Sequence, residues 1–230
     1  MKTPDLAKVA SIIGNPSRAA MLSALLGGQS LLASELARIA SISPQTASAH
    51  LAKMMQAGLI GQEAQGRHRY YRLANPEVGQ ALESLNVIAP MKPVRSLRES
   101  QQLQSLRFAR TCYDHLAGQV GVAVADALLN QGLLKASGPN FILTEAGEQW
   151  FQAFGIKPDA LRKSRRHFAR QCLDWSERRN HLAGALGAAF AAQLFERHWM
   201  RTVPGSRALR FTEEGLKSLS SLIGHEALTM

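Results

Sequence analysis

Apolar residues recur at helical spacing in two neighbouring segments near the start of the chain. Leu36, Ile39 and Ala40 share one face of a segment that runs roughly from Ser34 to Ala40, and Leu51, Met54 and Met55 share one face of the next. Ser41-Ile42-Ser43 is the short connection between them. Two helices joined by so short a turn are typical of a helix-turn-helix.

Helix starts are marked by a capping residue followed by proline. Four such pairs occur: Thr3-Pro4, Asn15-Pro16, Ser43-Pro44 and Asn75-Pro76. The polar side chain accepts a backbone N–H at the helix start, and proline is tolerated because its missing N–H would have no partner there. Gly27-Gly28 and Gly58 come where the helices beginning at Pro16 and Pro44 are expected to end.

The second helix of the pair, from Pro44 to about Ala57, is predicted to be the recognition helix. Small Ala47 permits close approach of the neighbouring helix, and the polar residues face outward or lie at the flanks. Short hydrogen-bonding side chains and a cation suit base edges and phosphates in a major groove. The residues expected to contact DNA from this helix are Ser43, Gln45, Thr46, Ser48, His50 and Lys53.

A β-hairpin is predicted directly after this helix. Leu59 to Glu63 indicates a strand, Ala64-Gln65-Gly66 a turn, and Arg67 to Leu73 a returning strand with Tyr71 and Leu73 pointing inward. The tip carries Arg67, His68 and Arg69. A basic hairpin that follows a recognition helix is typical of a wing that contacts a flanking phosphate or the minor groove.

The second half of the chain repeats itself. Ala89 to Pro93 interrupts the helical pattern and indicates a linker, after which Ser96 and Glu99 predict a capping box and a long helix to about Leu116. Three blocks then recur in order: 109–114 as 169–174, 115–121 as 181–187, and 141–147 as 209–215. The second copy carries about six additional residues, Trp175 to Asn180.

These patterns predict a mainly α chain with small β-hairpins, in the α+β class. Residues 1–90 are expected to form a winged helix-turn-helix domain for DNA binding and dimerisation. Residues 95–230 are expected to form an effector-sensing domain of two winged-helix-like units, about 95–158 and 159–230, each with the order helix, helix, hairpin, helix. A cleft between such units is a common place for a ligand.

The first domain resembles the ArsR family of bacterial transcriptional regulators. The resemblance covers about 80 residues and rests on five segments in order: Asn15 to Arg18, Glu35 to Ala37, Ser43 to Leu51, Ala57 to Ile60 and Gly66 to Leu73. It implies a homodimer, usually a repressor, that leaves its operator when an effector binds. It also implies a dimer interface near Leu6 to Ile13 and Val78 to Val87.

Two departures from the family concern its metal sites. Family members that sense metals often carry cysteines in the helix before the recognition helix, where this chain has Glu35 to Ala40 without cysteine. Others place histidine and acidic ligands on the last helix, where Glu77 to Val87 offers Glu77 and Glu83 but no histidine. The resemblance therefore does not identify what this chain senses.

A different set of residues is the candidate effector site. Cys112 and His115, three apart, are expected to share a helix face, and Cys172 and His181 occupy the same repeat positions. Three interpretations stay open: contacts to a small organic effector, buried packing residues, and ligands of zinc or another soft metal. The third is weakened by the additional six residues, which would break helical phase. The expected effector contacts are Cys112, Tyr113, His115, Cys172, Trp175 and His181.

Composition agrees with a DNA-binding protein of the cytoplasm. The net charge is +10, which favours a polyanionic partner, and the excess is largest over 161–230, with 12 basic against 6 acidic residues. Apolar runs are too short to span a bilayer, no secretory signal is expected at Met1 to Asp5, and two cysteines do not predict a disulfide framework.

The predicted function is a sequence-specific transcriptional regulator, a homodimeric repressor of a double-stranded DNA operator. A metal- or thiol-responsive sensor and an effector-independent DNA binder are the alternatives. No nucleophile elbow, phosphate-binding loop or zinc-hydrolase helix predicts an enzyme.

Overall fold

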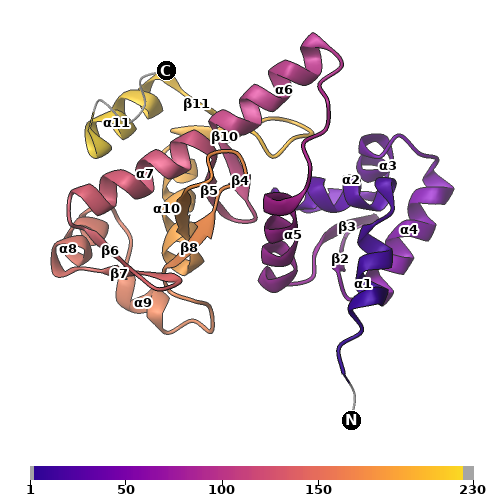
Figure 1. Cartoon of the computed structure of the whole chain (residues 1–230), viewed down its shortest axis with the longest axis horizontal. Coiled ribbons are helices and arrows are strands. Elements are labelled where there is room, and N and C mark those ends of the chain that lie inside the picture. Colours follow the sequence, from indigo (N-terminus) through magenta and orange to yellow (C-terminus); the bar gives the residue numbers. More distant parts are fainter. Residues whose placement is uncertain (1–2, 225–230) are drawn as a thin grey trace. The chain divides into compact units, whose positions relative to one another are not determined.

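The computed structural model describes residues 3–224 and divides the chain into two compact units. Among the described residues, the first comprises 3–85 with 204–206, and the second 86–203 with 207–224. Both combine helices with small antiparallel sheets, which confirms the expected mixed class (Figure 1). No helix among residues 3–224 is long and apolar enough to cross a membrane.

The first unit is a winged helix-turn-helix, as predicted. Its elements are α1 (Leu6–Ile13), α2 (Pro16–Leu25), β1 (Leu31–Leu32), α3 (Ala33–Ile39), α4 (Pro44–Gln56), β2 (Ile60–Gln65), β3 (His68–Leu73) and α5 (Pro76–Ile88). The short strand β1 was not expected from the sequence, because two residues carry no periodicity. It pairs with β3 and so places the wing in a three-stranded sheet of order β1-β3-β2.

Capping side chains begin the helices of this unit largely where the sequence indicates. The side chains of Asn15, Ser43 and Asn75 each accept a backbone N–H from the first turn of α2, α4 and α5. The prediction for α1 was wrong. That helix begins at Leu6, because Asp5 rather than Thr3 accepts the backbone N–H of Lys8.

The helix-turn-helix is held by a small apolar core. Leu36, Ala47, Leu51 and Met54 are buried at the contact between α3 and α4, as their spacing predicts. Gly58 has φ +70°, a conformation that glycine adopts without strain, and it ends α4 and begins the wing. The buried inner face of α4 therefore packs against α3.

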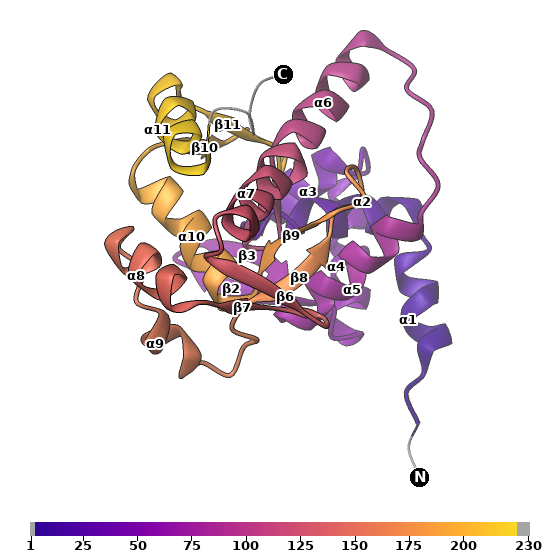
Figure 2. The same cartoon turned by 60° about the vertical axis from the view of Figure 1, so that its left-hand side comes forward.

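The second unit is built from two halves with the same order of elements: a hairpin, a helix, a second hairpin and a further helix (Figures 1 and 2). After helix α6 (Leu97–Phe108), the first half contains β4 (Arg110–Cys112), β5 (His115–Ala117), α7 (Gly118–Asn130), β6 (Leu134–Ser137), β7 (Asn140–Leu143) and α8 (Glu145–Ala153). After α9 (Pro158–Arg162), the second half contains β8 (Arg170–Leu173), β9 (Asn180–Ala183), α10 (Gly184–Glu196), β10 (Met200–Thr202), β11 (Leu209–Phe211) and α11 (Glu213–Ile223).

The two halves make matching backbone contacts with each other. Phe141 N–H donates to Ala169 O at 3.1 Å, and in the same way Leu209 N–H donates to Ala109 O at 2.9 Å. The second hairpin of each half thus pairs with the first hairpin of the other half. Pairing of β7 with β8 makes a four-stranded sheet of order β6-β7-β8-β9, and Arg110 and Ala208 form the corresponding bridge on the other side. The repeated sequence blocks fall on equivalent elements, and their origin by duplication stays a prediction.

The expected helix through 109–116 was wrong. Helix α6 ends at Phe108, and residues 110–117 form the hairpin β4–β5, in which Cys112 pairs with His115. Gly118 has φ +81° and Gly184 has φ +82°, so no α-helix continues across either position. The predicted order helix, helix, hairpin, helix therefore lacked the first hairpin of each half.

The additional residues of the second half have a different effect from the one expected. They lengthen the loop between β8 and β9, and Cys172 still pairs with His181 across this hairpin. Register across a hairpin is set by which residues pair, not by the length of the loop between them. The insertion therefore does not separate Cys172 from His181, and the expected break in helical phase was wrong.

Candidate functional site

The outward face of α4 is polar and accessible. Ser43, Gln45, Thr46, Ser48 and Lys53 are exposed. The side chains of Gln45 and Lys53 point away from the core residues of the same helix, so both can reach a partner outside the chain. The polar face that the sequence predicted is therefore exposed on α4.

Three of the predicted contacts on α4 also have a local structural role. Ser43 Oγ accepts the backbone N–H of Thr46 at 3.2 Å, so it caps the helix. Ser48 Oγ donates to Pro44 O at 3.0 Å. His50 is half-buried, and its Nδ1 lies 3.4 Å from Nη1 of Arg18. Burial first, and then the charges of Arg18 and Lys53, lower the pKa of His50.

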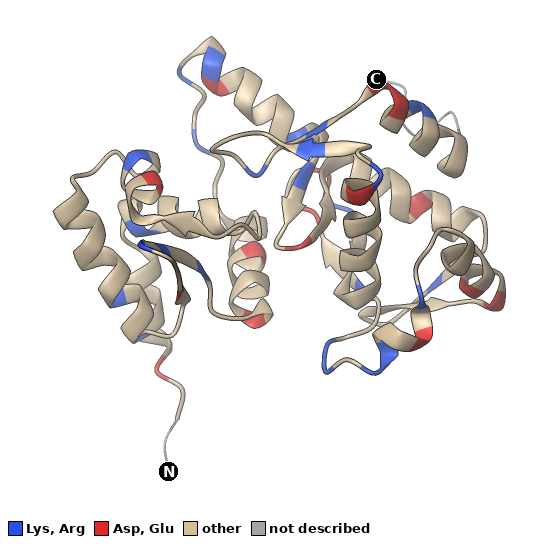
Figure 3. Cartoon of the chain, turned by 180° about the vertical axis from the view of Figure 1, so that it is seen from behind, with Lys and Arg blue, Asp and Glu red and all other residues tan. Residues whose placement is uncertain are grey.

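The wing presents arginine at an exposed hairpin. Gly66 and Arg67 form the two-residue turn between Gln65 and His68, and Arg67, His68 and Arg69 are all exposed. Gly66 has φ +59°, as a tight two-residue hairpin turn requires. The first strand extends two residues further than predicted, to Gln65, because pairing continues up to that turn, and the second begins one residue later than predicted, at His68. Lys and Arg are distributed over both units (blue in Figure 3).

A second candidate site lies in the second unit, where the two hairpins β4–β5 and β8–β9 meet. Cys112, His115, Cys172 and His181, here called the Cys-His cluster, come from these four strands, and their ligand atoms lie within 4.8 Å of one another. Cys112 Sγ is 3.7 Å from Cys172 Sγ, and His115 Nε2 is 3.2 Å from His181 Nε2. Each half contributes one thiol and one imidazole.

A carboxylate lies behind each imidazole of the cluster. His115 Nδ1 is 3.4 Å from Oδ1 of Asp114, and His181 Nδ1 is 3.2 Å from Oδ2 of Asp174, although the latter pair is not aligned as a hydrogen bond. A carboxylate beside Nδ1 favours the proton on that nitrogen and leaves Nε2 with a free lone pair. When the rings are neutral, the two Nε2 atoms, which face each other, can both act as electron-pair donors.

The pKa values of two members of the cluster, His115 and Cys172, are shifted by their neighbours. Burial alone would lower the pKa of His115, but its hydrogen bonds to Asp114 and Cys172 outweigh burial and raise it to about 9. The hydrogen bond with Cys112 lowers the pKa of the Cys172 thiol far below its usual range against the effect of burial, and His115 and His181 lower it further. Cys172 therefore has the thiolate character that a metal ligand or a reactive thiol needs.

Asp174 and Arg110 hold the two halves together beside the cluster. Arg110 Nη2 donates to Asp174 Oδ1 at 2.8 Å, and the two side chains are 1% and 0% exposed. Asp174 also accepts backbone N–H groups from Gly118, Ser176 and Glu177. Arg110 and Asp174 are repeat equivalents of Arg170 and Asp114, but Asp114 pairs with Arg166, so the two halves differ in this ion pair.

Two predicted effector residues lie outside the Cys-His cluster. Tyr113 occupies the turn of β4–β5 with φ +60°. Trp175 stacks on the guanidinium of Arg110, with the carbon Cζ 4.4 Å from the ring centroid. The pairing of Arg110 with Asp174 had a sequence signal, the repeated Arg and Asp positions, whereas nothing in the sequence indicated that Trp175 covers Arg110.

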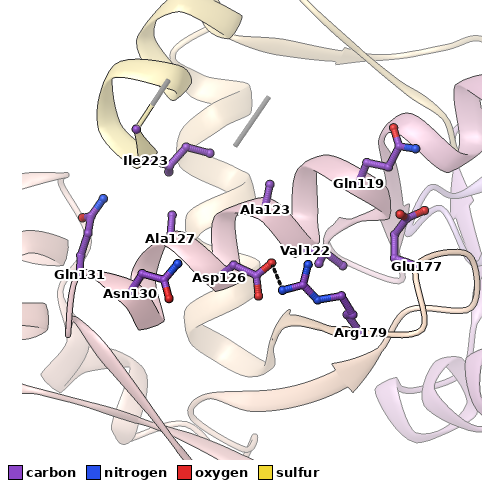
Figure 4. A pocket seen from close by; sticks show the side chains of 11 residues that line it. Gln119, Val122, Ala123, Asp126, Ala127, Asn130, Gln131, Glu177, Arg179 and Ile223 are labelled. Carbon is purple, nitrogen blue, oxygen red and sulfur yellow. Dashed lines mark ion pairs between the residues drawn. The ribbon is translucent and has the colours of Figure 1, made fainter. Parts of the chain in front are cut away.

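A cavity of about 630 Å³ opens beside α7 (Figure 4). An ion pair between Asp126 Oδ2 and Arg179 Nη2, 2.7 Å apart, lies in it. None of the six predicted effector residues lines it. The lining is mixed in polarity and comprises Gln119, Val122, Ala123, Asp126, Ala127, Asn130, Gln131, Glu177, Arg179, Ile223 and Gly224.

Comparison with known proteins gives one match over nearly the whole chain. Residues 13–63 match a helix-turn-helix domain model. The uncharacterized HTH-type transcriptional regulator YdfF of Bacillus subtilis (strain 168) is 49% identical over 212 residues, which are 92% of this chain and 94% of YdfF.

Solved structures match over less than half of the chain. The homodimeric winged helix-turn-helix DNA-binding domain of Mb0332 from Mycobacterium bovis is 23% identical, with a TM-score of 0.34, over 38% of this chain and 89% of that domain. The cadmium sensor CmtR from Mycobacterium tuberculosis is 27% identical, with a TM-score of 0.32, over 40% of this chain and 100% of its own.

Proposed function

Because the chain belongs to the family of HTH-type transcriptional regulators, we propose that it is a homodimeric repressor that leaves its operator when an effector binds to the second unit. Family membership makes the chain a DNA-binding regulator rather than an enzyme, as its resemblance to the ArsR family predicted. The proposal concerns three further properties: assembly as a homodimer, repression rather than activation, and control by an effector.

The observation that carries the proposal is the pairing of an exposed polar helix face with an exposed basic hairpin. The outward side chains of α4 suit base edges, and Arg67 and Arg69 of the wing suit phosphates. One recognition helix covers only a half-site, so a two-fold dimer is expected to bind an inverted repeat. Sequencing of duplexes selected from a random pool by the full chain tests this, and a pool without enrichment would contradict it.

Replacing Gln45 by Ala is expected to weaken binding to the selected operator by about 1–3 kcal/mol and to relax the preference at one position of each half-site. Gln45 is exposed at the start of α4 and is suited to donate and accept on one base edge. Fluorescence anisotropy on matched and single-substituted duplexes measures both effects. Gln56→Ala, an exposed glutamine at the other end of the same helix, is the control and should bind like the parent.

The proposed dimer interface comprises α1 and α5, which present apolar residues outward. Helix α1 has no buried residue although most of its residues are apolar, and Leu6 is 78% exposed. Leu85 on α5 is also exposed. A second copy of the chain would remove these apolar faces from water.

Leu6→Glu is expected to weaken the dimer at least about tenfold, because a carboxylate would have to be desolvated at the interface. Sedimentation equilibrium over a concentration series measures the dissociation constant. Leu97→Glu makes the same change at an exposed leucine of α6, outside the proposed interface, and should leave dimerisation unchanged. A parent protein that is monomeric and still binds the inverted repeat tightly would contradict this part of the proposal.

The second unit offers two places for an effector, the Cys-His cluster and the cavity beside α7. An effector changes operator affinity only if it binds the two conformations of the regulator with different affinities. Operator titrations with and without metal ions or small metabolites therefore test effector control. Operator affinity unchanged by every addition would favour the effector-independent alternative.

A further inference from the structure

We propose that the Cys-His cluster is a tetrahedral site for one zinc-class metal ion per chain, on the pseudo-two-fold axis between the two halves of the second unit. This proposal is argued from the positions of four side chains, Cys112, His115, Cys172 and His181. Metal binding at the cluster is independent of the proposed function. A role of the bound metal as the effector rests on the proposed function.

The spacing of the ligand atoms fits a tetrahedron around an ion of this class. Zinc binds thiolate sulfur at about 2.3 Å and imidazole nitrogen at about 2.0–2.1 Å, so in a regular tetrahedron two sulfurs lie about 3.8 Å apart and two nitrogens about 3.3–3.4 Å apart. The observed separations are 3.7 Å between Cys112 Sγ and Cys172 Sγ and 3.2 Å between His115 Nε2 and His181 Nε2. Both like pairs therefore match a tetrahedral site, and all four atoms lie within 4.8 Å of one another.

The surroundings supply what such a site needs beyond its ligands. Asp114 and Asp174 lie at the Nδ1 side of the two histidines, so in the neutral rings the lone pairs of both Nε2 atoms would be directed at each other. Two facing lone pairs repel unless a proton or a metal ion lies between them. Carboxylates behind ligating histidines are a regular feature of zinc sites, because they fix the tautomer and raise the basicity of the ligand.

Backbone packing keeps the two hairpins at this distance. A Cβ on Gly121 would lie 3.6 Å from Cβ of His181, and a Cβ on Gly187 would lie 3.3 Å from Cβ of His115, while each would lie under 3 Å from a carbonyl of its own half. Each glycine is thus required mainly by the carbonyl of its own half, Leu116 O or Leu182 O, and it lies against the histidine of the other half. The helix of each half therefore packs directly against the histidine of the other half.

The donor set decides which ions would bind. Two thiolates and two imidazoles favour zinc, cobalt(II) and cadmium over magnesium or calcium, which prefer oxygen ligands. Four protein ligands close the coordination sphere and leave no position for a substrate, as in sites that hold structure rather than catalyse. The ion would link β4–β5 to β8–β9, so its arrival or loss would act on the contact between the two halves.

The test is a cobalt(II) titration of the full chain, stripped of metal and kept reduced. We expect the visible bands of tetrahedral cobalt(II) and a thiolate-to-cobalt charge-transfer band, both saturating at one equivalent and both bleached by zinc. The chain has two cysteines, so a charge-transfer band reports on Cys112 or Cys172 and on no other residue. Cobalt binding without that band, or no binding, would overturn the proposal.

Variants separate the cluster from other histidines. Cys172→Ser and His181→Gln should each weaken cobalt binding at least about 100-fold, and Asp114→Asn about tenfold, as expected for removal of a ligand and of the carboxylate that orients one. His167→Gln, an exposed histidine of the same unit, is the control and should bind like the parent. Unchanged affinity in Cys172→Ser or His181→Gln would overturn the assignment of ligands.

A second measurement covers the case in which a variant folds poorly. Saturating zinc should raise the melting temperature of the parent and of His167→Gln, because the ion binds the folded state, and it should not raise that of Cys172→Ser. An equal rise in Cys172→Ser would contradict the proposal. None of these readouts involves DNA, so their failure leaves the proposed operator binding standing, and operator titration with and without zinc tests the effector role by itself.

Discussion

Asp174→Ala is expected to lower the free energy of unfolding of the second unit by about 3–5 kcal/mol, since it leaves the buried guanidinium of Arg110 without its carboxylate. The variant also removes the acceptor for the backbone N–H of Gly118, at the start of α7. For a unit of this size the change corresponds to a fall in melting temperature of about 6–20 °C. Thermal and urea unfolding, both in the presence of a chelator, measure it without a contribution from metal.

The matched control is Asp126→Ala. Asp126 also pairs with an arginine of the second unit, but the side chains of Asp126 and Arg179 are 28% and 62% exposed. Water screens an exposed pair, so the change should cost no more than about 1 kcal/mol. If the two variants unfolded alike, the Arg110–Asp174 pair would not be what joins the two halves beside the Cys-His cluster.

Replacing Arg67 and Arg69 together by Gln is expected to weaken operator binding about 100-fold at 0.1 M salt and to weaken binding to non-specific duplexes as well. Both side chains are exposed on the wing, and a dimer would have four fewer cations facing DNA. Each cation that neutralises a phosphate adds about 0.9 to the slope of log affinity against log salt, so the slope should become shallower by about 3–4. Anisotropy titrations at several salt concentrations give both quantities.

A charge-matched control is available on another hairpin. Arg201 and Arg210 are exposed and lie opposite each other on β10–β11, and replacing both by Gln removes the same charge from the chain. This variant should retain most of the operator affinity and the salt dependence of the parent. An equal decrease of affinity in the two double variants would mean that net charge, and not the wing, determines binding.

Much of the first unit was determined by the sequence over short distances. Asn15, Ser43 and Asn75 cap helices through backbone groups three residues away, and Gly58 ends α4 by its own conformation. The alternation of Tyr71 and Leu73 decides which face of β3 is buried. Such signals act within one turn or one hairpin, so the recognition helix and the wing could be predicted without knowledge of the tertiary structure.

The tertiary structure decided what residues 110–117 are. Each strand of β4–β5 has three residues, too few for periodicity to distinguish a strand from a helix. Thr111 N–H donates to Arg207 O, almost a hundred residues away along the chain, and this partner stabilises the extended conformation. The sequence therefore singled out Cys112 and His115 but placed them on the wrong element.

For the Cys-His cluster, the sequence indicated the residues and the tertiary structure decided their distances. The repeat of one cysteine and one histidine, with the paired Arg and Asp positions beside them, was visible in the sequence and identified all four residues. Their separations of 3.7 Å and 3.2 Å join positions 60 and 66 residues apart. Those distances depend on the packing of one half against the other, where Gly121 and Gly187 lie against the histidines of the opposite half. No local pattern encodes such packing, because it is a property of two surfaces in contact.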